Sequence, residues 1–257
     1  MKKTTALIIG ISLGLAATNV SAGILYYSQD SNSNGLFSLN TTTAAPTLLG
    51  TSNVTSQTVG LSPSTNPDIL YGTTWTNLAH INADGSGATN VGSIAQEGLA
   101  LDPTSGILYG SINGTFSSFN PNNGSLIASL SAPGGDVEGL AYNAGLIYGL
   151  ADGGNLSFYD ILSGAWSVIG NTGVNFDQIG LAYDTGLGNL YAIGGQDPYL
   201  YSINPTTAAA TRIGDTGFAD AGGGLAFVSA VPEPATLALF GLGLAGMGFA
   251  RKKRKSA

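Results

Sequence analysis

Five acidic residues stand just before copies of a repeated Gly-Leu motif in this 257-residue chain. They precede the glycine by one to four positions and are Glu97, Asp136, Glu138, Asp177 and Asp220. If each motif begins the innermost strand of a ring of sheets, the five carboxylates gather at one mouth of the central channel. Ca²⁺ binds about six to eight oxygen ligands of this kind, and two neighbouring carboxylates are also the acid–base pair of glycoside hydrolysis. A third interpretation stays open, that they are solvated loop residues of an acidic protein.

Other residues that support catalysis are scarce. His80 is the only histidine, and the repeats place it at a strand position that is serine in three other copies. We therefore expect a strand residue there, and neither a Ser-His-Asp triad nor a histidine metal site. Trp75 and Trp166 would stack on sugar rings or pack in the core. With no cysteine in the chain, disulfides and thiolate sites are excluded as well, and we predict that the protein is not an enzyme.

The charges are unevenly distributed along the chain. Arg212 is the only lysine or arginine between residues 23 and 230, where there are fourteen acidic residues and a net charge of −13. Nucleic-acid binding needs lysine and arginine to neutralise phosphates. We therefore expect no nucleic-acid partner, and a lone arginine also argues against a site that clamps phosphate or carboxylate groups.

The segment between residues 23 and 230 consists of repeats, and these determine where the acidic residues lie. The Gly-Leu motif recurs at intervals of 38, 41, 41 and 44 residues. Its copies are Gly60-Leu61, Gly98-Leu99, Gly139-Leu140, Gly180-Leu181 and Gly224-Leu225. Three further marks recur in a fixed order: an aliphatic residue before tyrosine, a short segment that ends in Asn or Asp, and an aliphatic residue before glycine. The third repeat departs from the last mark at Leu130.

Each mark has the composition of a short β-strand bounded by turn residues, and the recurring Asn or Asp is expected to hydrogen-bond the backbone two residues on. Four strands in about 41 residues is the repeat of a β-propeller blade. The body thus resembles a β-propeller repeat domain, and we predict an all-β, five-bladed propeller of four-stranded blades, flanked by an N-terminal signal helix and a C-terminal transmembrane helix. A final strand at 224–228 would complete the blade that begins near Leu25 and close the ring. An open stack of the same repeats is the alternative.

The first 22 residues have the composition of an export signal. Lys2 and Lys3 form a basic start, an apolar run follows over 6–17, and small residues lead up to Ala22. We expect signal peptidase to cut between Ala22 and Gly23, which places the body outside the cytoplasm. A permanent N-terminal anchor is the alternative.

The last 27 residues contain three features in order. Residues 231–234 form a stretch stiffened by two prolines, and residues 235–250 are an uncharged run that would span about 24 Å as a helix. Five basic residues follow: Arg251, Lys252, Lys253, Arg254 and Lys255. Basic residues stay on the cytoplasmic side, so the cluster would stop transfer and hold the body on the periplasmic side of the inner membrane.

This tail resembles the PEP-CTERM sorting signal of Gram-negative bacteria, with Pro232, Glu233 and Pro234 at its signature triplet. The resemblance covers only the tail, so it implies targeting and not activity. It implies cleavage by an exosortase, an integral-membrane cysteine transpeptidase, after transient anchoring in the inner membrane. The body is then released or transferred to the cell surface. A permanent single-span anchor is the alternative.

The sequence therefore predicts a signal peptide at 1–22, a propeller at 23–230 and a sorting tail at 231–257. We predict an exported surface or extracellular-matrix protein whose propeller is a non-enzymatic interaction or structural module, processed by signal peptidase and exosortase. Two alternatives stay open: a module that binds extracellular polysaccharide, and a Ca²⁺-dependent hydrolase or glycosidase that uses the channel-mouth carboxylates.

Overall fold

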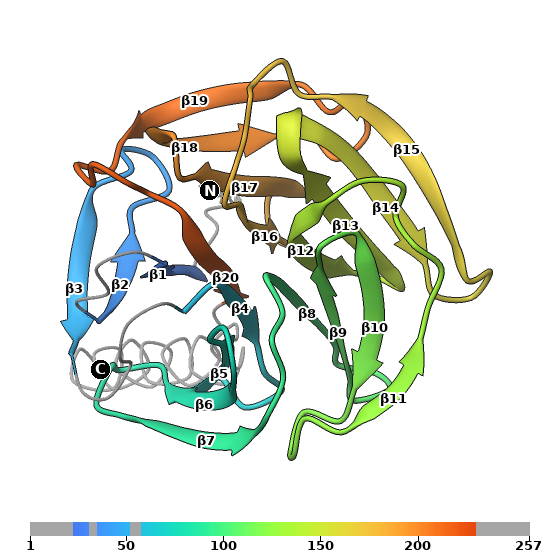
Figure 1. The fold of residues 1–257 in the computed structure, drawn as a ribbon. Helices are drawn as coiled ribbons and strands as arrows, with labels where there is room; N and C mark the ends of the chain where they lie inside the picture. Colours follow the sequence, from blue (N-terminus) through green and yellow to red (C-terminus); the bar gives the residue numbers. More distant parts are fainter. Residues whose placement is uncertain (1–22, 31–34, 52–57, 230–257) are drawn as a thin grey trace, which may run out of the picture.

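Five four-stranded antiparallel sheets surround a central axis (Figure 1) in the computed structural model, which describes residues 23–30, 35–51 and 58–229. The predicted signal helix at 1–22 and transmembrane helix at 235–250 lie outside the described residues. Within the described ranges no helix is long and apolar enough to cross a membrane. The helical structure found there is one 3-10 turn, Asp152–Gly154.

Four of the blades follow the chain order from the channel outwards. The second is β4 (Gly60–Pro63), β5 (Ile69–Thr73), β6 (Leu78–Asn82) and β7 (Ala88–Gly92). The third is β8 (Gly98–Asp102), β9 (Ile107–Ile112), β10 (Thr115–Phe119) and β11 (Leu126–Ser129). The fourth is β12 (Val137–Asn143), β13 (Leu146–Ala151), β14 (Asn155–Asp160) and β15 (Ala165–Asn171). The fifth is β16 (Gly180–Asp184), β17 (Asn189–Gly194), β18 (Asp197–Ile203) and β19 (Ala210–Asp215).

The first blade joins the two ends of the body. Its strands are β20 (Gly223–Ser229), β1 (Gly23–Gln29), β2 (Leu36–Leu39) and β3 (Pro46–Gly50), with β20 innermost. The β20–β1 pairing is antiparallel, with Leu225 opposite Tyr27. The predicted ring closure is thus confirmed, and the open stack is wrong. Within the described residues, every strand pairs with strands of 23–229, and the five sheets form one closed ring.

The turns between third and fourth strands carry the local chemistry that the repeats predict. Asn40 Oδ1 accepts hydrogen bonds from the backbone N–H groups of Thr42 and Thr43, at 2.9 and 3.0 Å. Asn204 holds the same turn through Thr206, at 2.8 Å. Asn82 is the exception, because its turn is held by Asp84, which accepts from the Ser86 N–H at 2.9 Å. These residues therefore shape hairpins.

The glycines and leucines of the Gly-Leu motif build the channel. A Cβ on Gly180 would lie 2.4 Å from the Gly223 carbonyl oxygen, so the inner strands approach too closely for a side chain there. The neighbouring leucines are each at most 2% exposed and form a ring around the axis that leaves no room for a water molecule. This leucine ring consists of Leu61, Leu99, Leu140, Leu181 and Leu225. It separates the two mouths of the channel.

Candidate functional site

One mouth of the channel is lined by acidic side chains. The inner strands of neighbouring blades pack around the axis and begin at the same end, so the residues just before or at their starts meet there. We term this end the acidic mouth, defined by Asp30, Glu97, Asp136, Glu138, Asp152, Asp177 and Asp220. The five carboxylates predicted from the sequence all belong to it.

Four of the five predicted residues come close together, and Asp152, which was not predicted, lies with them. One carboxylate oxygen each from Glu97, Asp136 and Glu138 lies within 4.8 Å of the others, and the same holds for Glu138, Asp152 and Asp177. Glu138 therefore belongs to both groups. Asp220 lies outside both and is near Asp30, whose pKa is raised by burial and then by the negative charge of Asp220.

Glu138 is the most constrained carboxyl group at the acidic mouth. It is 8% exposed, and the Ile179 N–H donates to its Oε2 at 3.1 Å. Burial, followed by the charges of Asp152 and Glu97, raises the pKa of Glu138 to about 8. This shift favours the protonated form of Glu138, which donates a hydrogen bond to Asp152. A bound cation would neutralise the same charges in place of this proton.

Backbone donors hold two of the surrounding carboxylates, those of Asp136 and Glu97. Asp136 Oδ1 accepts from the Gly114 N–H at 2.9 Å. The Asn113 N–H donates to the Glu97 carboxylate, while Glu97 Oε2 is buried with no hydrogen-bond partner among the described residues. Burial, then the charge of Asp136, raises the pKa of Glu97. The space beside Glu97, Glu138 and Asp30 measures about 20 Å³, which admits one water molecule or ion.

Sequence reasoning missed Asp30 and Asp152. They directly follow β1 and β13, which are the second strands of their blades. Because each second strand is antiparallel to its inner strand, its end lies beside the inner strand's start. The sequence does show an acidic residue after the aliphatic-Tyr strand in these two repeats. Its place at the acidic mouth follows only once that strand is known to form a hairpin with the inner strand.

The other candidates have structural contacts. His80 pairs with Tyr71 across β5 and β6, and its Nε2 lies 2.9 Å from the Pro121 carbonyl oxygen, which confirms a strand residue. Trp166 packs edge-on against Phe116 at 5.0 Å between ring centroids. Trp75 differs, because it is 42% exposed, lines the acidic mouth, and donates a hydrogen bond to Asp30.

Arg212, the single cation of the body, lies on the outer strand β19. Its guanidinium carbon is 3.1 Å from the centre of the Tyr199 ring, a cation–π contact within one blade. This contact gives the arginine a role in packing.

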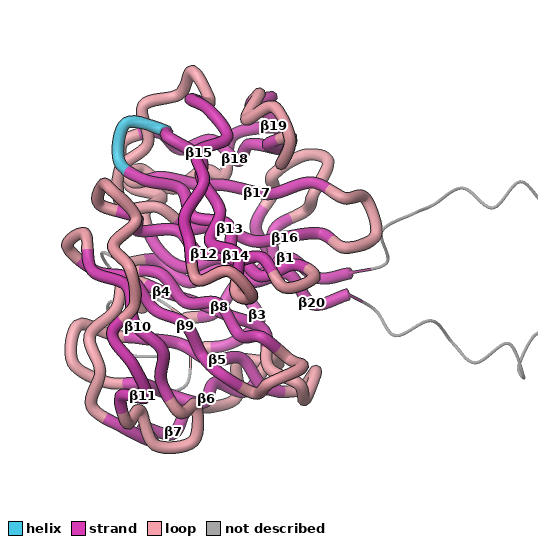
Figure 2. The backbone as a smooth tube through the Cα atoms, turned by 90° about the vertical axis from the view of Figure 1, so that its right-hand side faces the viewer, coloured by secondary structure: helices cyan, strands magenta, loops and turns pink. Residues whose placement is uncertain are grey.

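The opposite mouth is apolar and contains a cavity of about 330 Å³ above the leucine ring. We term it the apolar mouth. It is defined by the lining residues two positions after the leucine of each Gly-Leu pair, which are Pro63, Leu101, Tyr142, Tyr183 and Phe227. Ser229 lines it, and Gly23 pairs with Ser229. Both ends of the body therefore lie on this face (Figure 2).

The predicted processing residues fall mostly outside the described residues. Gly23 is the first residue of β1, whereas Ala22, the triplet Pro232, Glu233 and Pro234, and the basic cluster 251–255 are not described. Their roles therefore stay predictions from the sequence.

Residues 230–255 match the model of the PEP-CTERM protein-sorting motif. The match begins directly after Ser229, the last residue of β20. It confirms the resemblance of the tail and indicates an exported protein with an exosortase as its processing partner. None of the curated proteins matches the chain.

Two solved structures resemble the chain. A chain of the nidogen/laminin complex is 14% identical, with a TM-score of 0.51 and 81% of each chain covered. A structural genomics protein of unknown function from Bacteroides thetaiotaomicron is 13% identical, with a TM-score of 0.47 over 74% of this chain and 50% of that one. The first similarity supports the fold alone, and we conclude nothing from the second.

Proposed function

We propose that this chain is an exported, exosortase-sorted protein of the cell surface or extracellular matrix, with its propeller as a non-enzymatic interaction or structural module. The observation that carries the proposal is the direct continuity between β20, which ends at Ser229, and the sorting motif, which begins at residue 230. A ring closed by its own ends needs nothing from the tail, so the tail can be cleaved without loss of the fold.

The position of Ser229 also orients the body during sorting. Pro232 lies three positions after Ser229, a reach of about 11 Å at most. With the tail in the inner membrane, the apolar mouth would face the bilayer and the acidic mouth would point away from it. The surface presented outwards would then be the acidic one.

The sorting claim is tested by substituting the triplet in the producing strain. With Glu233→Gln and Pro234→Ala together, the protein should accumulate in the inner-membrane fraction with its tail attached. The parent, and the control Asp68→Asn on an exposed loop of the body, should reach the surface or medium without the tail. Unchanged location and mass of the triplet variant would contradict the proposal.

A second candidate function is the binding of extracellular polysaccharide at the acidic mouth, with Ca²⁺ held by the shared carboxylates. The exposed indole of Trp75 beside Asp30 favours it, because an aromatic face packs on the apolar face of a sugar while carboxylates accept from its hydroxyls. The two groups that share Glu138 supply the oxygen ligands that Ca²⁺ prefers.

A glycan-binding screen of residues 23–229, with and without Ca²⁺, tests this second candidate. Binding that needs Ca²⁺ and is lost in Trp75→Ala would support it, with Trp166→Phe as the control at a packed tryptophan. Release of sugar from the bound glycan, abolished by Glu138→Gln, would instead favour the hydrolase alternative, in which the protonated Glu138 is the general acid. On the proposal above, no sugar is released.

A further inference from the structure

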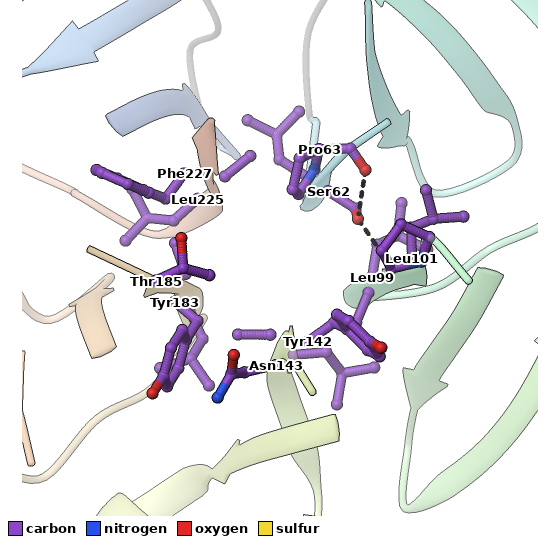
Figure 3. Close-up of a pocket in the computed structure, with 18 of the residues that line it drawn as sticks. Ser62, Pro63, Leu99, Leu101, Tyr142, Asn143, Tyr183, Thr185, Leu225 and Phe227 are labelled. Carbon is purple, nitrogen blue, oxygen red and sulfur yellow. Dashed lines mark hydrogen bonds between the residues drawn. The ribbon is translucent and has the colours of Figure 1, made fainter. Parts of the chain in front are cut away.

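The cavity at the apolar mouth has the size of a small-molecule site. Its volume of about 330 Å³ lies within the range of about 300–1,000 Å³ that such sites occupy. The leucine ring forms its floor, and the inner strands of all five blades form its wall, so the cavity lies on the axis (Figure 3).

The wall carries no charge. Among the residues that line the cavity none is acidic or basic, although the described body as a whole is strongly acidic. Pro63, Leu101 and Phe227 contribute apolar surface, and Tyr142 and Tyr183 contribute aromatic rings (Figure 3). An ion that entered would lose hydration with no charged partner, so the lining selects an uncharged molecule.

Most polar groups near the cavity already have partners. The Ser62 hydroxyl donates to the Pro63 carbonyl and accepts from the Leu101 N–H. Thr185 and Ser229 hydrogen-bond each other at 2.8 Å.

Two polar side chains at the cavity edge remain without a hydrogen-bond partner in the described part of the chain. They are the amide of Asn143, at the end of β12, and the hydroxyl of Tyr183, in β16, and both side chains line the cavity (Figure 3). Tyr183 stacks on Tyr148 with 5.5 Å between centroids, so its ring is fixed in place. The two side chains offer hydrogen-bond donors and acceptors on an otherwise apolar wall.

We propose that the apolar mouth binds an uncharged, amphipathic small molecule. Its compact apolar ring system packs on the leucine ring, and a hydroxyl or carbonyl group at one end hydrogen-bonds Asn143 or Tyr183. This site is separate from the acidic mouth, because the leucine ring closes the channel between them.

The direct test uses 2-naphthol as the probe and 2-naphthoate as its anionic counterpart, with residues 23–229 and calorimetric or fluorescence titration. We expect one saturable site for 2-naphthol and at least about tenfold weaker binding of 2-naphthoate, since the carboxylate has no partner in the cavity. Equal affinity for the two probes, or no saturable binding of 2-naphthol, would overturn the proposal.

Variants locate the site. Thr185→Trp places a large side chain at the exposed rim and should abolish 2-naphthol binding, whereas Leu162→Trp, on a turn where the leucine is 96% exposed, should leave it unchanged. Asn143→Ala should weaken binding about two- to tenfold through loss of one hydrogen bond. Equal melting temperatures of the variants exclude unfolding as the cause. Unaltered binding in folded Thr185→Trp would contradict this site.

A last experiment tests whether the chain's own tail fills the cavity. Residues 23–257 in lipid nanodiscs should bind 2-naphthol as the body does. Binding by 23–229 but not by 23–257 would show that the tail fills the cavity, and would overturn the proposal of an external ligand.

Discussion

Glu138 and Asp152 share a hydrogen bond between their carboxyl groups, although one lies in β12 and the other just after β13. The β12–β13 hairpin creates this pair, because it places the end of the second strand beside the start of the first. The raised pKa of Glu138 favours a proton between two groups that are both ionised in the unfolded chain at neutral pH. A cation bound at the acidic mouth would compete with this proton.

The stability of the body should fall as pH rises from about 5 to 9 in the presence of EDTA. The pKa of Glu138 is about 8 in the native state, against about 4.3 for an unperturbed glutamate. Between these values the native state binds more protons than the unfolded state, so raising the pH lowers the free energy of unfolding. Melting temperatures of residues 23–229 across this range measure the effect.

Glu138→Gln should flatten this pH dependence, since glutamine remains neutral throughout. Asp84→Asn is the matched control, because Asp84 is fully exposed and its pKa is lowered by hydrogen bonds from Ser86. An equally steep decline in Glu138→Gln would assign the effect to other groups.

Millimolar Ca²⁺ should raise the melting temperature of the body if the acidic mouth is a cation site. A ligand that binds only the native state at about 100 times its Kd adds about 2.7 kcal/mol, or roughly 5–10 °C for a domain of this size. Mg²⁺ should do less, because it requires a tighter octahedral shell. Differential scanning calorimetry at fixed pH measures the gain.

Two controls separate a site from screening of an acidic surface. Glu138→Gln should reduce the Ca²⁺ gain, while Asp160→Asn, at a turn remote from the mouth, should keep it. NaCl at matched ionic strength should not replace Ca²⁺. Equal stabilisation by both salts, unchanged in Glu138→Gln, would leave only an acidic surface.

The leucine ring should be a principal source of stability. Leu99 is 1% exposed at the axis, and Leu99→Ala should cost about 2–5 kcal/mol because it removes packing and leaves a cavity. Leu162→Ala, at a side chain that is 96% exposed, should stay within about 0.5 kcal/mol of the parent. Urea unfolding of residues 23–229 compares them. A similar small cost for both would mean that the ring is not well packed.

A glycine of the repeated motif should not tolerate a side chain. In Gly180→Ala the new Cβ would lie 2.4 Å from the Gly223 carbonyl oxygen, so the inner strands must separate, at a cost of about 1–3 kcal/mol. Gly87→Ala meets nothing closer than 3.7 Å and should be neutral or slightly stabilising. Thermal melts that rank the two variants in the opposite order would refute the close approach of inner strands.

The fold could be predicted because each structural step has a local sequence cause. The Gly-Leu pairs mark close inner strands, and residues such as Asn40 and Asn204 mark hairpin turns. The Gly-Leu pairs recur in every blade and the Asn or Asp turn in four of the five, so a prediction made at one repeat is checked at the next. Even the irregular third repeat fits, since β11 ends at Ser129, just before Leu130.

The sites could be predicted only in part, because they combine residues that do not recur. Asp152 joins the acidic mouth through hairpin pairing, which spacing along one strand does not reveal. At the apolar mouth the residues after the motif differ from blade to blade, from Pro63 to Tyr183 and Phe227. A comparison of the repeats detects only positions that recur, so it overlooks these residues. Only the assembled ring shows that they line one cavity.

The separation of the exported propeller from its sorting tail can be measured as the intact mass of the native protein from the cell surface or culture medium. We expect a mature chain that starts at Gly23 and lacks residues 235–257. A strain with an active exosortase in which most molecules retain the full tail would contradict it.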